Sequence, residues 1–219
     1  MSIIYAGTGD AYAGSTSGTS WSGAQGDVNT IGSSHSNSQT SYDFAVYNIY
    51  SGGRGGNTYF SKRAFFPFDL SGEGGTVSSV ELKIYMDNLG STGVNDDVTI
   101  VQATALAGLG ADYGNVYAHH TTWGTELVTP ISVSATAAYH TFTFTSGGIS
   151  RLQSAVGSGT FTLGLVGDYY DFNGNAPSLG GDYTKIKVWF ADHGTSSFRP
   201  YLDITYEAVD NATFFGTNF

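Results

Sequence analysis

The chain has 219 residues and a net charge of −10, from 18 acidic and 8 basic side chains. This charge would repel a nucleic-acid backbone, so DNA and RNA are excluded as partners. Only 12% of the residues are charged, and the 31 glycines are about twice the average usage of roughly 7%. A surface made of Ser, Thr, Asn, Gly and Tyr favours strands and turns over helices. The absence of cysteine excludes disulfides and thiol chemistry.

The start of the sequence has none of the features of a secretion or membrane signal. Residues 1–14 (MSIIYAGTGDAYAG) contain no basic cluster and no sustained apolar stretch. No run in the chain approaches the ~20 apolar residues that a membrane span requires. Together with the absence of cysteine, this predicts a protein that folds in a reducing cytoplasm and has no membrane partner.

Apolar and polar residues alternate with a period of two in many short segments. This alternation is typical of half-buried β-strands. Clusters of Gly, Asn, Asp and Ser separate the segments, so we expect eight to ten short strands in an all-β sandwich or barrel. In chain order the expected strands lie near residues 2–7, 42–50, 63–70, 80–86, 97–104, 140–144, 161–165, 186–190 and 202–206.

One short helix is expected within residues 149–159 (ISRLQSAVGSG). Ile149, Leu152 and Val156 have helical spacing, and Gly157 is a stop signal. Pro67 lies inside a strand-like segment, and it indicates an edge or a bulge because proline cannot donate to a ladder.

The segments belong to a single domain, predicted over residues 1–210. Within it, residues 14–41 are a Ser/Gly-rich loop of low complexity. Residues 211–219 form an aromatic C-terminal tail with Phe214, Phe215 and Phe219. Three free aromatic rings would be a liability on a monomer. We expect the tail to dock on a neighbouring subunit, and the alternative is that it folds back on its own sandwich.

Three segments of the chain resemble the motifs of one domain family. They are RAFFPFDLS at 63–71, TVSSVELKIY at 76–85 and FRPYLDITY at 198–206. Their order, with a short helix and FTLGLVG between the second and the third, resembles that of the DNRLRE-type and carbohydrate-binding-module-like jelly-roll domains. The matching positions are Arg63, Phe68, Asp69, Leu70, Ser71, Val77, Ser78, Leu82, Tyr85, Arg199, Pro200, Leu202, Ile204 and Tyr206.

The resemblance implies a jelly-roll β-sandwich of about eight to ten antiparallel strands with one short helix. Stand-alone members look like structural or tail-associated proteins of bacteriophages. The expectation is therefore a non-enzymatic virion protein, a capsid decoration or a tail or fibre component. It would pack on other virion proteins or on copies of itself as a homo-oligomer, with a trimer as the guess. The alternative is a glycan-binding module at a cell surface or in the extracellular space, used for attachment to host or surface polysaccharide.

Residues 168–175 (DYYDFNGN) offer oxygen ligands for a cation. Asp168, Asp171 and Asn173 are candidates for Ca²⁺, which takes six to eight oxygens. The spacing is not that of an EF-hand, and Asn173-Gly174 is also typical of a type I′ turn. Both interpretations stay open, as they do for residues 95–97 (NDD). No other cofactor is expected.

Aromatic side chains in loops are candidates for glycan binding, because their amphipathic rings stack on the apolar faces of sugars. Trp21 in the low-complexity loop, Trp123, Tyr169 and Tyr170 are the residues that we single out. Packing is the alternative for Trp123, as it is for Trp189. Trp21 is expected to be exposed, or to be buried against a neighbouring subunit.

No catalytic constellation is recognisable in the sequence. The G-x-S-x-G, H-E-x-x-H and P-loop motifs are absent. His119 and His120 are adjacent, so in a strand they point to opposite faces and do not share a metal. We expect a protein that is not an enzyme. A polysaccharide-degrading enzyme is the weakest alternative, because two carboxylates can meet across a fold whatever their spacing.

Overall fold

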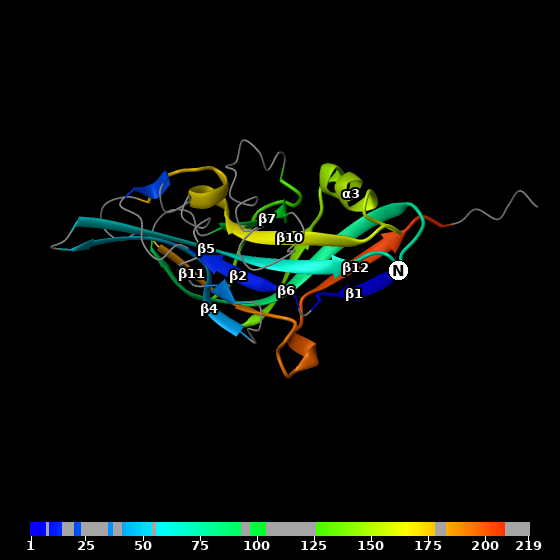
Figure 1. Cartoon of the computed structure of the whole chain (residues 1–219), viewed down its shortest axis with the longest axis horizontal. Helices are drawn as coiled ribbons and strands as arrows, with labels where there is room; N and C mark the ends of the chain where they lie inside the picture. Colours follow the sequence, from blue (N-terminus) through cyan, green and yellow to red (C-terminus); the bar gives the residue numbers. More distant parts are fainter. Residues whose placement is uncertain are drawn as a thin grey trace, which may run out of the picture.

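The computed structural model describes residues 1–7, 9–14, 20–22, 35–36, 41–53, 56–92, 97–103, 126–177 and 183–208. In these ranges the chain forms an all-β sandwich of two antiparallel sheets, as predicted (Figure 1). No helix in the described ranges is long and apolar enough to cross a membrane. The jelly-roll connectivity stays a prediction. The loop at 14–41 lies largely outside the described residues, and the tail at 211–219 lies entirely outside them.

The main path of strand pairing is β1-β12-β6-β11-β4-β5-β10-β7-β8. Three further strands branch from it: β2 pairs with β5 and β3, and β9 pairs with β6. The bounds are β1 Ser2–Tyr5, β2 Ala11–Gly14, β3 His35–Ser36, β4 Ser41–Gly53, β5 Gly56–Asp69, β6 Val77–Thr92, β7 Asp97–Ala103, β8 Ile131–Ser132, β9 Ala138–Thr143, β10 Thr160–Gly167, β11 Tyr183–Trp189 and β12 Tyr201–Tyr206.

The long strand β6 has three neighbours. Its first half pairs with β12, and its second half pairs with β11. β9 pairs with residues 81–86 and overlaps the β12 register, so it lies along the opposite edge of β6. These pairings place β1, β12, β6, β9 and the end of β11 in one continuous surface.

The core lies between the sheets and follows the predicted alternation. In β6, Val80, Leu82, Ile84 and Met86 are buried, whereas the intervening residues are partly exposed. The other core strands contribute in the same way, although His140 and Tyr206, which the period of two also places inward, are half-buried. The core residues outside β6 include Phe66, Phe68, Phe142, Phe161, Leu163, Leu165, Ile186, Val188, Phe190, Leu202 and Ile204.

The predicted helix is confirmed as α3 (Ser146–Gln153), although it begins three residues before Ile149 and ends before Val156 and the expected stop at Gly157. Thr145 caps it, because its side chain accepts a hydrogen bond from the Gly148 N–H. Gly148 is needed there, since an added Cβ would overlap the Leu127 carbonyl oxygen. At the other end of the helix, Gln153 accepts from the Val77 N–H at 2.7 Å and donates to a second backbone oxygen at 3.1 Å.

Pro67 lies within β5, and the prediction of an edge is borne out locally. Its carbonyl oxygen accepts from the Gly7 N–H at 2.8 Å, on the side of β5 away from β10. β2 pairs with β5 only as far as Phe65, so no described strand runs beside Pro67 on that side. The missing N–H therefore removes no ladder bond among the described strands.

The outer faces of the two sheets differ. The short π-helical turn η2 (Asp168–Phe172) and the 3-10 turn η3 (Ser196–Phe198) lie on opposite sides of the sandwich (Figure 1). On the side of η2, the outward residues of β5 are buried, including Arg63 and Phe65. On the side of η3, the outward residues of β6, β11 and β12 are only half-buried. That second face carries the candidate site.

Candidate functional site

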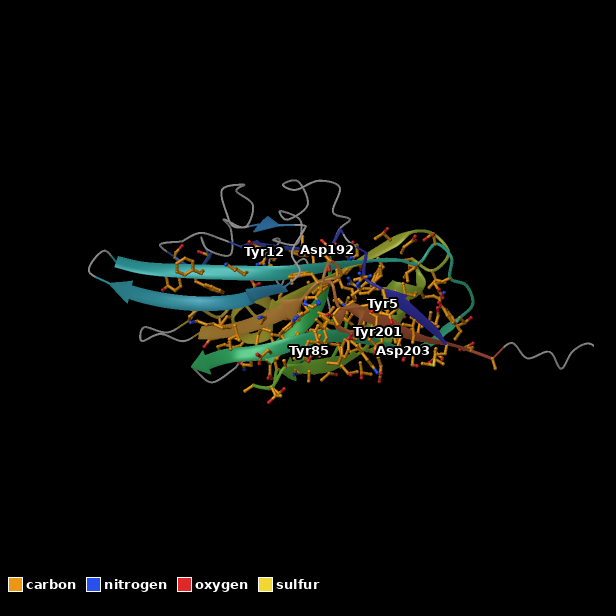
Figure 2. The ribbon with its side chains drawn as sticks, turned by 90° about the horizontal axis from the view of Figure 1, so that it is seen from below. Tyr5, Tyr12, Tyr85, Asp192, Tyr201 and Asp203 are labelled. Atoms are coloured by element: carbon orange, nitrogen blue, oxygen red, sulfur yellow. The ribbon has the colours of Figure 1, made fainter. Side chains whose placement is uncertain are left out.

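Six aromatic rings gather on the outer face formed by β1, β12, β6, β9 and β11, together with the turn η3. We call this group the aromatic strip. Five of the six rings are half-buried and the sixth, that of Tyr5, is 54% exposed. Figure 2 shows Tyr5, Tyr201 and Tyr85 following one another across neighbouring strands. The aromatic strip consists of Tyr5, Tyr85, Tyr139, Trp189, Phe198 and Tyr201.

Strand register brings the rings together. Tyr5 of β1 lies opposite Tyr201 of β12, and Tyr85 of β6 lies opposite Tyr139 of β9. Side chains directly opposite one another in an antiparallel pair have their Cβ atoms about 4.5–5.5 Å apart, so aromatic pairs in this position contact. Because side chains alternate between faces, burying the even-numbered residues of β6 and β12 turns these rings outward.

The rings make a continuous series of contacts. The centroid distances are 5.7 Å from Tyr5 to Tyr201, 5.4 Å from Tyr201 to Tyr139 and 5.3 Å from Tyr139 to Tyr85. Trp189 follows at 5.1 Å from Tyr85, edge to face. Offset and edge-to-face pairs at these distances contribute about 0.5–1.5 kcal/mol each beyond their buried area. Each ring of the series is therefore supported by direct contact with its neighbours.

The loop of residues 191–199 closes one end of the strip. It carries Phe198, whose ring stacks on Tyr85 at a centroid distance of 4.4 Å and an angle of 29°. The Tyr139 hydroxyl donates to the carbonyl oxygens of Ser197, at 2.7 Å, and Arg199, at 3.0 Å. Burial, followed by the neighbouring tyrosines, raises the pKa of Tyr139 to about 12, so this hydroxyl stays a donor at neutral pH.

Charged groups border the rings. The Lys83 ammonium lies 3.3 Å from the Glu81 carboxylate and 6.0 Å from the centroid of Tyr201. Lys187 lies over Trp189, with its nitrogen 4.9 Å from the ring centroid. Asp203 is opposite Glu81 in the β12–β6 register. The strip is therefore an apolar surface with hydrogen-bonding groups along its margin.

The strip continues along the edge strand β1. Met1 is 81% exposed and Ile3 is 51% exposed, on the same side of β1 as Tyr5. Among the described strands, β1 pairs with β12 alone. An edge strand with exposed apolar side chains is suited to contact with another molecule.

Three of the residues predicted to bind glycans, Trp21, Tyr169 and Tyr170, are described, and they lie on the side of η2. Trp21 is buried within its own chain, so the expectation that it is exposed is wrong. Its indole N–H donates to the Tyr170 carbonyl oxygen at 3.1 Å, and both side chains are at least 95% buried. Tyr169 is half-buried, edge-on to Tyr170 at 5.1 Å. Buried rings offer no face to a sugar, so the structure corrects the role predicted for Trp21 and Tyr170.

The calcium interpretation fails at Asp171. Both of its carboxylate oxygens accept from Arg63, each at 2.6 Å, and both side chains are 1% exposed. Asp168 bonds to the Asn173 amide instead. No group of three or more His, Cys, Asp or Glu in the described part of the chain is placed to hold a metal. The segment is a turn, but not of type I′, because φ is −86° at Asn173 and only Gly174 has a positive φ, of 72°.

Asp168 also lies beside the acidic residue Glu126, and the two carboxyl groups are hydrogen-bonded. Burial, and then the hydrogen bond and charge of Asp168, raise the pKa of Glu126 to about 7. Burial also raises the pKa of Asp168, and the charge of Asp97 acts in the same direction. The pair therefore holds a proton at mildly acidic pH.

Several predicted residues lie outside the described part of the chain. They include the candidate glycan-binding residue Trp123 and the assembly residues Phe214, Phe215 and Phe219. Trp189 is described, and it packs on the outer face against Tyr85 rather than in the core between the sheets. In the sequence, Tyr85 and Tyr201 appear as the outward members of alternating strands. The register that joins them to Tyr5 and Tyr139 has no signal in a single sequence.

Comparison of the chain with models of protein families and with curated proteins found no match. The resemblance to the jelly-roll domains therefore stays a prediction.

Proposed function

We propose that the protein is a non-enzymatic binding module that recognises a glycan through the aromatic strip. The observation that supports this proposal is the continuous contact of six rings on one outer face, with the Tyr5 ring 54% exposed. Tyrosine and tryptophan rings present an apolar face to a sugar and keep a polar group for its hydroxyls. The ring contacts hold the surface in place before the ligand arrives, which lowers the entropy cost of binding.

Polar groups at the margin suit the same ligand. Glu81 and Asp203 offer acceptors, and Lys83 offers donors, beside Tyr201. A polysaccharide presents alternating apolar ring faces and hydroxyl groups, so it can use both kinds of surface at once.

Binding to a panel of immobilised polysaccharides, measured with the purified chain and with Tyr5→Ala, tests the proposal. Removing one stacking ring should weaken binding by about 3- to 10-fold, which corresponds to about 0.5–1.5 kcal/mol. Leu89→Ala is the matched control, because Leu89 is a 43% exposed apolar residue that lies outside the strip. The proposal is wrong if the folded protein binds no polysaccharide, or if Tyr5→Ala and Leu89→Ala behave alike.

A second candidate function is that of a virion structural component, a capsid decoration or a tail or fibre protein that packs on copies of itself or on other virion proteins. The exposed apolar residues of the edge strand β1 favour it, because such an edge can extend a sheet into a neighbouring molecule. Light scattering of the purified chain tests the self-association. A monomer at every concentration would argue against packing on copies of itself, and an Ile3→Lys variant should dissociate any assembly that forms through β1.

A further inference from the structure

Asp10 is a buried carboxyl group that the aromatic strip does not contain. It is 1% exposed, and its Oδ2 atom accepts from the Ala191 N–H at 2.5 Å. Its other oxygen, Oδ1, is buried and has no hydrogen-bond partner in the described part of the chain. Buried polar atoms without partners are rare in proteins and are commonly satisfied by ordered water or by function.

Arg199 has the complementary feature at the other end of the loop 191–199. Its Nε–H group is buried and also lacks a partner in the described ranges. The two side chains are close enough for the charge of Arg199 to act on Asp10.

We propose that Asp10 is a positioning residue for the aromatic strip: it holds Ala191 at the start of the loop 191–199 and so keeps Phe198 on Tyr85. Phe198 stacks against the Tyr85 ring at 4.4 Å, so the position of the loop sets the shape of this part of the strip. This inference rests on the proposed function for its biological meaning, but its geometry is independent of any ligand.

The protonation of Asp10 gives the loop a pH dependence. Burial, with a smaller effect of the Asp192 charge, raises the pKa of Asp10 from 3.8 to about 7, against the opposing effects of the Ala191 N–H and of Arg199. When the loop opens, the carboxyl group meets water and its pKa returns toward 3.8. The closed loop therefore binds the proton more tightly, and raising the pH through 7 favours the open loop.

Hydrogen exchange of the Ala191 amide, corrected for the intrinsic pH dependence of exchange, measures this opening directly. Between pH 6 and pH 8 the opening equilibrium of the natural protein should rise about 10-fold, as expected for a closed-state pKa of about 7. Asp10→Asn keeps an oxygen acceptor for Ala191 and has no charge to titrate, so its corrected exchange should not change with pH. Asp69→Asn, at a carboxyl group on the surface, is the control and should behave as the natural protein does.

Equal pH dependence in the natural protein and in Asp10→Asn would overturn the proposal. Asp192→Asn provides a second test that leaves Asp10 in place. Removing the neighbouring negative charge should move the midpoint of the exchange profile to lower pH, and an unchanged midpoint would count against Asp10. Should the exchange behave as expected while no polysaccharide binds, the role of Asp10 in the loop stands and the glycan function fails.

Discussion

Breaking the ion pair between Arg63 and Asp171 should destabilise the protein strongly. The pair joins β5 to η2 across 108 residues, and the two side chains are 1% exposed. Asp171→Asn keeps the shape of the side chain and one acceptor, but it removes the negative charge. The Arg63 guanidinium then stays buried without the carboxylate that accepted two of its hydrogen bonds.

The structure allows the size of this effect to be estimated. Each hydrogen bond is 2.6 Å long and joins two charged groups, and such bonds contribute about 1.5–3 kcal/mol. Removing one partner of a buried pair costs about 3–5 kcal/mol. By contrast, the pair of Lys83 and Glu81 is 26% and 43% exposed and should contribute only about 0–1 kcal/mol.

Urea unfolding of Asp171→Asn and of the control Glu81→Gln measures the difference. We expect a loss of about 3–5 kcal/mol for the first and less than about 1 kcal/mol for the second, with an unchanged dependence on urea. The double variant Arg63→Met, Asp171→Leu should recover much of the loss, because apolar residues can replace a buried ion pair. A loss below 1 kcal/mol in Asp171→Asn would refute the reasoning.

Three further predictions concern the packing of α3 and the acidic pair. Gly148→Ala should lower the free energy of unfolding by several kcal/mol, because the added Cβ would overlap a backbone carbonyl oxygen. Gly147→Ala should be neutral or should stabilise the protein by about 0.5–1 kcal/mol. Thermal melting of the two variants distinguishes these outcomes. Gln153→Ala should cost about 1–3 kcal/mol, since it removes two bonds to the backbone, and equal stability in urea would contradict that role. Glu126 holds its proton more tightly in the folded state, so the stability of the protein should fall as the pH rises from 4.5 to 7. Glu126→Gln should reduce this fall in the melting temperature. A pH profile of melting that is unchanged in the variant would show that the pair of Glu126 and Asp168 does not titrate in this range.

The strands were predictable because alternation depends on neighbouring residues alone. In β6, Val80 to Met86 show the period of two that separates core from surface, and the structure places them accordingly. The helix was predictable for the same reason, but its start was not. That start depends on the Thr145 cap and on the approach of Gly148 to a distant carbonyl group.

The candidate site was much less predictable, because it depends on contacts between distant residues. Trp21 lies in a segment of low complexity, and its burial follows from a partner 149 residues away. Asp171 has the appearance of a loop ligand, and only the fold brings Arg63 to it. The rings of the aromatic strip come from separate strands, so their contact depends on register, and a single sequence does not encode register in any local pattern.

The pairing of β1 with β12 joins Ser2 to Ile204, the first described strand to the last. On a ribosome that adds about 5–20 residues per second, the partner of β1 emerges on the order of 10–40 s after β1 itself. During that interval the edge of β1 and the apolar face that it later helps to cover stay open to other chains. Sheets closed by such distant pairings fold slowly, in milliseconds to seconds even when the chain is complete. A chaperone, or a low local concentration, would therefore reduce the aggregation of the nascent protein during this interval.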